Sequence, residues 1–511
     1  MAERASVVAA ADLPAAVQRL KEKGARLVTM VGTDERAMSG HFALRYIFVP
    51  PATGARPAEP PRAETLLVLL DPERPIFPSI TPALPAAHWY EREVQDLLGL
   101  IPEGHPDPRP LVLHHWPKGY YPLRKDFVAP PAELLAEADG PGQGTLVTGE
   151  GTIAIPVGPI HAGIIEPGHF RFGAVGETVL HLEARLFYTH RGLEKVSEGK
   201  TVEEGLHIAG RICGACSVSH AVSYCQAVEA ALGLGVPARA AYLRTLFLEL
   251  ERLYNHVGDI GNLCAGTGLA FGVSQGSRLK EKLQRLNAAL VGHRFLRGAV
   301  AVGGMAVDLA PEQAQEIRKT LAAVEAEFGE LAEILFSDAS FMDRVATTGV
   351  LPAEAATDLG VVGVAARASG LDLDARRDWP HAAYGELPLQ VVTEKGGDVL
   401  ARLRVRAGEV AQSFGLIRAC LENLPGGEVR RAVAGGGPGE YRTGLGTTES
   451  PRGENVHWVR LDPQGRIERL RVRSASFTNW PAVPLAVPGN IVPDFPLINK
   501  SFELCYACLD R

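Results

Sequence analysis

The sequence predicts an α+β protein in which a small N-terminal α+β domain precedes a large, mainly helical domain with peripheral β-strands. The chain has 511 residues, 46% of them apolar, which is enough for two to four domains with real cores. Short apolar runs separated by turns fill the first part, and long segments of helical periodicity dominate after residue 200. A stretch rich in proline, glycine and acidic residues separates the two parts.

The first domain is expected over residues 1–129. Its expected elements are a helix at 13–23, strands at 26–30, 42–49 and 64–70, a helix at 87–98 and extended, proline-rich backbone at 102–122. Residues 130–151 are expected to form a linker that holds one short helical turn.

The second domain is expected over residues 152–511. Strand-like alternation is expected at 152–159 and 170–187, helices at 202–234, 237–260, 276–293, 311–336 and 397–424, and irregular structure with short strands at 435–511. Pro311 followed by Glu312 is typical of a helix start, because proline fits the first turn.

Composition excludes several classes of protein. Lys plus Arg number 52 and Asp plus Glu 59, so the net charge of −7 does not suggest a nucleic-acid binder. The N-terminus lacks the order of a secretory signal, and no stretch is apolar enough to span a bilayer. Seven cysteines are too few for a disulfide scaffold and favour a reducing compartment.

Two C-x-x-C elements hold four of the seven cysteines: Cys213 with Cys216, and Cys505 with Cys508. This spacing brings two thiolates within reach of one metal ion. Four such sulfurs could hold zinc, an iron–sulfur cluster or another soft-ligand metal, and a structural zinc site is the simplest interpretation. However, zinc ribbons bring their pairs from nearby hairpins, whereas here distant segments would have to meet, which suits a site at the centre of a fold. A redox dithiol is disfavoured because no βαβ pattern adjoins either pair.

The other three cysteines, Cys225, Cys264 and Cys420, lie alone in apolar helical settings and are expected to be buried hydrophobic residues. Three scattered thiols cannot readily supply the four ligands of a second iron–sulfur cluster. If electrons enter or leave the site, another subunit must carry them.

Several blocks resemble the large subunit of group 4 nickel–iron hydrogenases of the formate hydrogenlyase type (hydrogenase-3 and hydrogenase-4). These blocks are GPIHAGIIEPGHFRF, FYTHRGLEK, RICGACSVSHAVSYCQAVE, PRGENVHW, NWPAV and NIVPDFPLINKSFELCYACLDR. The segments WYEREVQDLLGLIPEGHP and YYPLRKDF resemble the 30-kDa subunit of respiratory complex I, and the second domain resembles its 49-kDa subunit. The resemblance covers nearly the whole chain in the same order.

The resemblance implies a nickel–iron centre. In the family, four thiolates bind nickel, and two of them bridge to an iron that carries carbon monoxide and cyanide. Carried over, Cys213, Cys216, Cys505 and Cys508 are the ligands, with Cys216 and Cys508 bridging. Hydrogen is split into a hydride held between the metals and a proton taken by a base. A four-iron four-sulfur cluster is implied in a partner subunit.

Three further residues match functional positions of the family. Glu194 matches a proton-relay glutamate, whose pKa burial is expected to raise; the alternative is a solvent-facing glutamate paired with Arg191 or Lys195. Arg452 matches an arginine poised over the metals; the alternative is an interdomain salt bridge. His220 is expected to hydrogen-bond a cysteine sulfur, or else to be a satisfied core histidine.

Other matches are less specific. His161, His169 and Tyr188 fall where the related complex I subunit shapes its quinone pocket. Seven charged residues of the N-terminal domain are expected to serve docking and folding: Glu91, Arg92, Glu93, Asp96, Arg124, Lys125 and Asp126. For Glu91, Arg92, Glu93 and Asp96 the alternative is a solvated helix face.

The sequence departs from the family in two places. Glu503-Leu504 replaces the usual Asp-Pro before the third cysteine, which keeps the charge but frees the backbone that proline would restrain, and leaves the surroundings of the centre and cofactor loading open. The sequence ends at Arg511, where the family's C-terminal extension is cut, so either a processed form or a gene without the extension is expected.

The resemblance therefore predicts an oxidoreductase subunit that interconverts H2 with protons and electrons. The implied partners are an iron–sulfur small subunit, antiporter-like membrane subunits and formate dehydrogenase, with the chain peripheral on the cytoplasmic face of the inner membrane. One alternative is a complex I-like NADH:quinone oxidoreductase subunit whose four cysteines are vestigial or bind zinc. Another is a non-catalytic scaffold with a structural zinc site.

Overall fold

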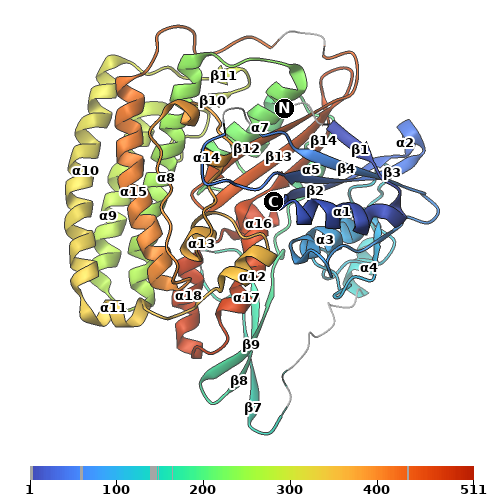
Figure 1. Cartoon of the computed structure of the whole chain (residues 1–511), viewed down its shortest axis with the longest axis horizontal. Coiled ribbons are helices and arrows are strands. Elements are labelled where there is room, and N and C mark those ends of the chain that lie inside the picture. Colours follow the sequence, from blue (N-terminus) through green and yellow to red (C-terminus); the bar gives the residue numbers. More distant parts are fainter. Residues whose placement is uncertain (1–3, 58–60, 138–146, 148, 164, 434–436) are drawn as a thin grey trace.

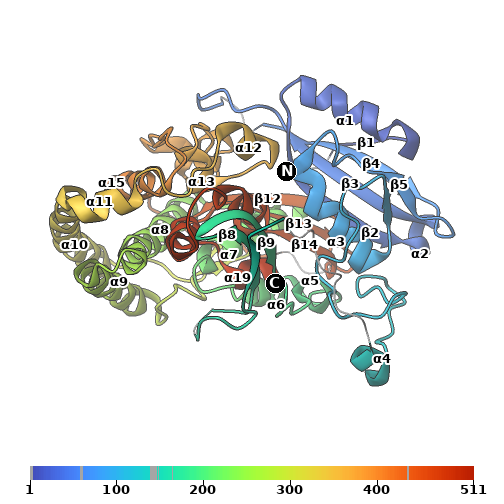
Figure 2. The same cartoon turned by 90° about the horizontal axis from the view of Figure 1, so that it is seen from below.

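The protein was studied as a computed structural model, which describes residues 4–57, 61–137, 147, 149–163, 165–433 and 437–511. An N-terminal unit, residues 4–126, packs against a larger C-terminal unit, residues 149–511. On the side of this larger unit that faces away from the N-terminal unit stand the helices α8 (Ala238–Gly266), α9 (Ala270–Val291), α10 (Pro311–Ser337) and α15 (Val399–Glu422) (Figures 1 and 2). This arrangement agrees with the α+β class expected from the sequence. Between the two units, residues 132–137 form the helical turn α4 expected in the linker, and residues 138–146 and 148 of that linker lie outside the described residues.

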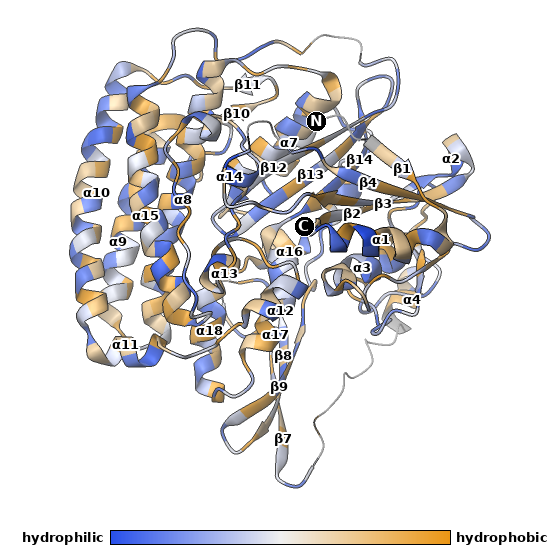
Figure 3. Cartoon of the chain, in the orientation of Figure 1, coloured by the Kyte–Doolittle hydropathy of each residue, from blue (hydrophilic) through white to orange (hydrophobic). Residues whose placement is uncertain are grey.

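The N-terminal unit is a four-stranded sheet in the order β1-β4-β3-β2, covered by helices α1 and α3. Its elements are β1 (Arg4–Val7), α1 (Leu13–Glu22), β2 (Arg26–Glu35), α2 (Arg36–Ser39), β3 (His41–Val49), β4 (Glu64–Leu70), β5 (Ile76–Pro78), α3 (His88–Leu98) and β6 (Ile101–Glu103). Strands β2 and β3 are almost wholly buried and mostly apolar (Figure 3). The expected helices and the central strands are confirmed, but β2 runs five residues further than expected because both its faces are covered.

The C-terminal unit begins with the antiparallel sheet β7 (Thr152–Val157), β8 (His169–Val175) and β9 (Thr178–Arg185), which projects from the body in Figure 1. Its helices and remaining strands include α5 (Leu193–Val196), α6 (Val202–Ala209), α7 (Ser217–Leu232), α8 (Ala238–Gly266), α9 (Ala270–Val291), α10 (Pro311–Ser337), α15 (Val399–Glu422), β12 (Arg442–Ser450), β13 (Gly453–Leu461), β14 (Ile467–Arg473), α16 (Ala475–Asn479), α18 (Phe495–Phe502) and α19 (Tyr506–Asp510). No helix in the described ranges is both long enough and apolar enough to cross a membrane.

Two expectations for this unit are wrong. The single helix expected over 202–234 is two helices, because the chain turns at 210–216 and aims the first cysteine pair inward. The segment 435–511 is more regular than expected: its described residues include the antiparallel sheet β12-β13-β14 and helices α16, α18 and α19. Glycine and arginine within these strands mask the usual apolar alternation.

Strand β12 packs closely against α7 because two glycines allow the backbones to meet. A Cβ atom on Gly444 would lie 2.0 Å from the carbonyl oxygen of Ala227, and one on Gly446 would lie 1.9 Å from that of Ser223. Larger residues would push the sheet away from the helix that follows the first cysteine pair.

Charged side chains fasten the two units together. Arg26 of β2 pairs with Glu454 of β13 at 2.7 Å, and Glu35 pairs with Arg460. The solvated helix face considered for α3 is not observed: its four charged residues are buried. Asp96 accepts the backbone N–H groups of residues 111–113, and Glu91 binds residues 79–81, so these two fold the N-terminal unit itself.

Candidate metal centre

The first cysteine pair lies in the turn between α6 and α7. Cys213 and Cys216 are both buried, and the N–H of Cys216 donates to the Cys213 sulfur at 3.1 Å. This turn-closing contact orients both sulfurs toward the interior, as their spacing predicts.

Helix α8 holds this turn from behind. Asn255 donates its side-chain amide to the Ala215 carbonyl oxygen at 2.7 Å, and Glu251 accepts the N–H groups of Val218 and Ser219 at 2.6 and 3.0 Å. Burial, reinforced by nearby Cys216, raises the pKa of Glu251 to about 8. The carboxyl group therefore satisfies donors at the start of α7 that would otherwise be unpaired.

The second pair lies at the start of α19. Cys508 donates its N–H to the Cys505 sulfur at 3.4 Å, which repeats the geometry of the first pair. Two serines after β14 fix this turn: Ser476 accepts the N–H of Cys505 at 2.9 Å, and Ser474 donates to the Cys508 carbonyl oxygen at 2.9 Å.

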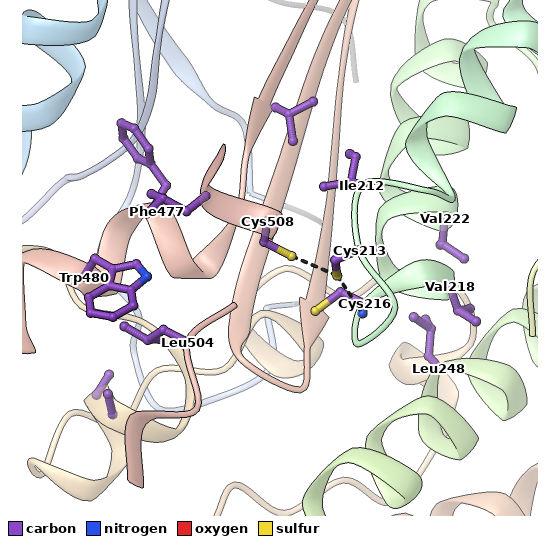
Figure 4. Packing of buried hydrophobic residues seen from close by; sticks show 14 of the residues in the cluster. Ile212, Cys213, Cys216, Val218, Val222, Leu248, Phe477, Trp480, Leu504 and Cys508 are labelled. Carbon is purple, nitrogen blue, oxygen red and sulfur yellow. Dashed lines mark hydrogen bonds between the residues drawn. The ribbon is translucent and has the colours of Figure 1, made fainter. Parts of the chain in front are cut away.

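All four sulfurs meet in one cluster. The sulfurs of Cys213 and Cys508 lie 2.9 Å apart (Figure 4). Hydrogen bonds among the four thiols hold the pKa of Cys216 and Cys505 well below the usual value and the pKa of Cys213 and Cys508 well above it. The structure thus brings the two cysteine pairs together, with Cys505 less buried than the other three, and their role as metal ligands stays a prediction. A buried set of sulfur donors, two of them readily ionised, fits a soft metal ion.

His220 lies beside this cluster, on the first turn of α7. Its Nε2 atom is 3.4 Å from the Cys508 sulfur, so of the two expectations the geometry favours contact with a cysteine. Burial lowers the pKa of His220 although Cys216 and Cys505 oppose this, which favours a neutral imidazole. The ring of His457 from β13 packs edge to face against it, with centroids 5.3 Å apart, and Ser223 in turn contacts His457.

Arg452 follows β12 and is 7% exposed. Its guanidinium forms a two-pronged pair with Asp259 of α8 and lies 3.9 Å from Glu503. Burial lowers the pKa of Arg452, but the negative charge of Asp259 outweighs this effect and keeps the pKa above its ordinary value. The charge of Cys216 raises the pKa further. The partner Asp259 belongs to the same unit, so the interdomain salt bridge considered for Arg452 is not observed.

Asp259 belongs to none of the motifs described from the sequence. Helix α8 carries Glu249, Arg252, His256 and Asp259 at helical spacing, and all four are buried. His256 continues the contact inward to Glu409 at 2.9 Å. The sequence does carry a pattern that indicates such a site: charged residues recur three or four positions apart along a helix that is otherwise apolar.

Glu503 ends α18 in the left-handed region, with φ of 51° and ψ of 40°. A proline disfavours helical backbone in the residue before it. Because Leu504 stands where the family has proline, Glu503 is free of this restriction and can adopt its left-handed helical conformation. Asn262 donates to the carboxylate at 2.7 Å, and burial together with Asp259 raises the pKa of Glu503 to about 7.

Glu194 occupies a buried site on α5, but its electrostatics differ from expectation. Its carboxylate lies 2.8 Å from Arg469, 3.3 Å from Arg471 and 3.4 Å from Arg511. Although burial opposes ionisation, these charges hold the pKa of Glu194 well below its usual range, so the expected rise is wrong. The pairing with Arg191 or Lys195 that was the alternative is also not observed. A role in relaying protons stays a prediction.

Arg191, in the same motif, performs a different task. Its guanidinium donates to the carbonyl oxygens of Ile212 and Ala507, both at 2.7 Å. One side chain thus bridges the two cysteine turns. This role of Arg191 could not be read from the sequence, because contacts with backbone carbonyl oxygens leave no pattern among the side chains.

The three residues matched to a quinone pocket do not form one cluster. His161 packs against Phe170 and Tyr506, whereas Tyr188 packs against His114 of the N-terminal unit. His169 lies in β8, and its Nδ1 atom has no hydrogen-bond partner among the described residues. A quinone site stays a prediction.

Three known families match separate parts of the chain. A family described as respiratory-chain NADH dehydrogenase, 30 Kd subunit, matches residues 6–133, and the corresponding 49 Kd subunit matches residues 267–435 and 438–511. A nickel-dependent hydrogenase family matches residues 191–265, which include the first cysteine pair, Glu194 and His220.

Individual relatives extend the match. Formate hydrogenlyase subunit 5 of Escherichia coli is 37% identical over 98% of this chain and 87% of its own length. Hydrogenase-4 component G of the same organism is 36% identical over 95% and 84%. Membrane-bound hydrogenase subunit alpha of Pyrococcus furiosus is 30% identical over 70% and 87%.

Three NADH-quinone oxidoreductase subunits match at 30% to 33% identity over 71% to 74% of this chain, so the complex I-like alternative is less favoured. Three observations point to the same family. The two formate hydrogenlyase-type relatives match at higher identity and over more of the chain than the NADH-quinone oxidoreductase subunits do. The cysteine sulfurs meet in one cluster, and the nickel-dependent hydrogenase family matches the segment that contains the first cysteine pair. The chain belongs to the large subunits of group 4 nickel–iron hydrogenases of the formate hydrogenlyase type, a family of oxidoreductases.

Proposed function

We propose that the protein is the large subunit of a membrane-associated hydrogenase complex that interconverts H2 with protons and electrons, as part of a formate hydrogenlyase-like assembly. The observation that carries the proposal is the convergence of four cysteine sulfurs, from turns 292 residues apart in sequence, on one buried point beside Arg452 and His220. A local zinc staple would not need such distant segments.

Cys213, Cys216, Cys505 and Cys508 would hold a nickel–iron centre, with the iron carrying carbon monoxide and cyanide. When bound, this group supplies heterolytic cleavage and formation of H2. Arg452 places a permanent positive charge next to the Cys216 thiolate and is fixed there by Asp259. His220 meets the Cys508 sulfur and so orients one ligand and limits its basicity.

For Glu194 the geometry favours charge balance. A carboxylate that accepts from Arg469 and from the Val472 N–H and stays ionised near neutral pH is poorly suited to accept a proton. Its position between three arginines suits the stabilisation of their charges instead.

Electrons would pass to a partner. Cys225, Cys264 and Cys420 lie in three different helices, and the potential metal-ligand group found among the described residues includes none of them. An iron–sulfur small subunit with a four-iron four-sulfur cluster would therefore carry electrons between formate dehydrogenase and the metal centre. Antiporter-like subunits would anchor the complex at the cytoplasmic face of the membrane.

Metal analysis and infrared spectroscopy of the purified complex test this proposal. The expected result is roughly one nickel per chain together with absorption bands of iron-bound carbon monoxide and cyanide. Zinc in place of nickel, with no such bands, would overturn the assignment and favour a structural site.

A further inference from the structure

Strand β14 carries an arginine at every second position, namely Arg469, Arg471 and Arg473. All three side chains lie on one face of the strand and reach into the N-terminal unit. Arg469 donates to the Gly32 carbonyl oxygen at 3.2 Å, and Arg473 donates to that of Val28 at 2.8 Å. Between them, Arg471 pairs with Glu93 of α3 at 2.6 Å. Because residues two apart share a face of a strand, the R-x-R-x-R pattern directs all three guanidinium groups to the same neighbour.

Glu93 is 2% exposed and contacts two cations of the C-terminal unit, Arg471 and Arg511. The same two arginines, with Arg469, surround Glu194. Glu194 alone would leave three buried guanidinium groups facing one carboxylate. Glu93 supplies the second negative charge, and it comes from the N-terminal unit.

Both cations that Glu93 contacts are tied to the second cysteine pair. Strand β14, which carries Arg471, leads directly into Ser474 and Ser476, and these hydroxyls hold the backbone of Cys508 and Cys505. Arg511 directly follows α19, the helix that contains Cys508. The rings of Phe477 and Tyr90 fill the space around the Arg471 guanidinium, at 5.4 and 5.6 Å.

We propose that Glu93 is a positioning residue for the Cys505–Cys508 turn, so that the N-terminal unit completes the support of the metal centre instead of serving only as a docking module. The link runs from Glu93 through Arg471 and the two serines on one side, and through Arg511 and α19 on the other. The inference rests on the proposed function in assigning metal ligands to this turn, but the local order of the turn can be measured without metal.

The test compares Glu93→Gln with Glu35→Gln in the full chain. Glu35 is a matched control because it also forms a buried ion pair across the two units, with Arg460, and it makes no contact with Arg471 or Arg511. Hydrogen exchange of residues 503–511 is followed by mass spectrometry in metal-free protein. Glu93→Gln should accelerate exchange there by about tenfold, the effect of losing one charge-assisted buried contact, and Glu35→Gln should not.

Two further readouts separate positioning from general stability. In the assembled complex, Glu93→Gln should lower the nickel content and shift the infrared bands. Glu93→Asp keeps the carboxylate and should restore both readouts in part. If Glu93→Gln does not fold, Glu93→Asp is used as the test variant in its place. Unchanged exchange at 503–511, or equal acceleration by Glu35→Gln, would overturn the inference. Absence of nickel from the wild-type complex would instead refute the proposed function. In that case the hydrogen-exchange result by itself would still decide whether Glu93 positions the Cys505–Cys508 turn.

Discussion

Tyr254 donates its hydroxyl group to the carbonyl oxygen of Gly214 at 2.9 Å, which ties the middle of helix α8 to the turn between Cys213 and Cys216. The ring is buried, and burial raises the pKa of the phenol well above its usual value, so the group remains a donor. The first ligand pair therefore depends on a helix that begins more than twenty residues later in the chain.

Tyr254→Phe should destabilise the protein by about 1 to 3 kcal/mol, because the Gly214 carbonyl oxygen loses its buried partner. We expect nickel content to fall as the cysteine turn loosens. Tyr242→Phe on the same helix is the control, since that hydroxyl pairs with Glu386 far from the cysteines. Equal nickel content in both variants would show that the contact does not position the ligands.

Cys508→Ser should abolish hydrogen turnover and nickel binding. A serine hydroxyl is a hard ligand that does not replace a thiolate at a soft metal centre. Cys420→Ser provides the comparison, because Cys420 is an isolated buried thiol in α15. Hydrogen evolution and metal content of both variants should differ sharply; full activity of Cys508→Ser would contradict the ligand assignment.

Arg452→Lys should keep the positive charge but lose the two-pronged contact with Asp259. We expect hydrogen evolution to fall by about tenfold to a hundredfold, the equivalent of one or two charge-assisted hydrogen bonds. Nickel content should stay normal, because Arg452 is not a ligand. Arg344→Lys, which alters a peripheral ion pair with Asp494, should leave the rate unchanged.

Glu194→Gln distinguishes charge balance from proton transfer. If the carboxylate balances Arg469, Arg471 and Arg511, its loss should lower thermal stability and nickel content together. A proton relay would instead give a fully loaded, stable enzyme with slow turnover. Measuring nickel, melting temperature and hydrogen evolution on one preparation decides between these outcomes.

The contact between the two units should weaken in acid through Glu454. Burial opposes ionisation of this carboxyl, but Arg26 and Arg473 prevail and lower its pKa to about 2 from 4.5. The pKa is lower in the folded state, so the stabilisation is present above pH 4.5 and is lost as the pH falls toward 2. The loss should total about 3 kcal/mol in the free energy of unfolding.

Glu454→Gln should therefore flatten the pH dependence of the free energy of unfolding between pH 4.5 and 2, measured by denaturant titration. Glu440→Gln removes a carboxylate that pairs with nearby Arg442 at the surface, and this variant should retain the full dependence. An unchanged slope in Glu454→Gln would show that this carboxyl does not carry the acid sensitivity.

Much of the fold followed from local patterns. Helices α1, α3, α10 and α15 appear within a few residues of their expected bounds, because each has a helical apolar period and clear terminal residues. The break at 210–216 could not be predicted in the same way. Apolar residues continue across it, and only the packing of α8 behind the turn makes the interruption stable.

The sequence alone was enough to single out residues that the structure brings together at the proposed metal centre: cysteine spacing indicated the two pairs, and the family motifs pointed to His220 and Arg452. Only the tertiary structure decided what surrounds them. Asp259, Arg191 and Glu93 act through contacts across 193, 316 and 418 residues of sequence. Ligand identity is a local chemical property, whereas the pKa and position of a buried charge depend on every group packed against it, and that packing forms only when distant segments meet.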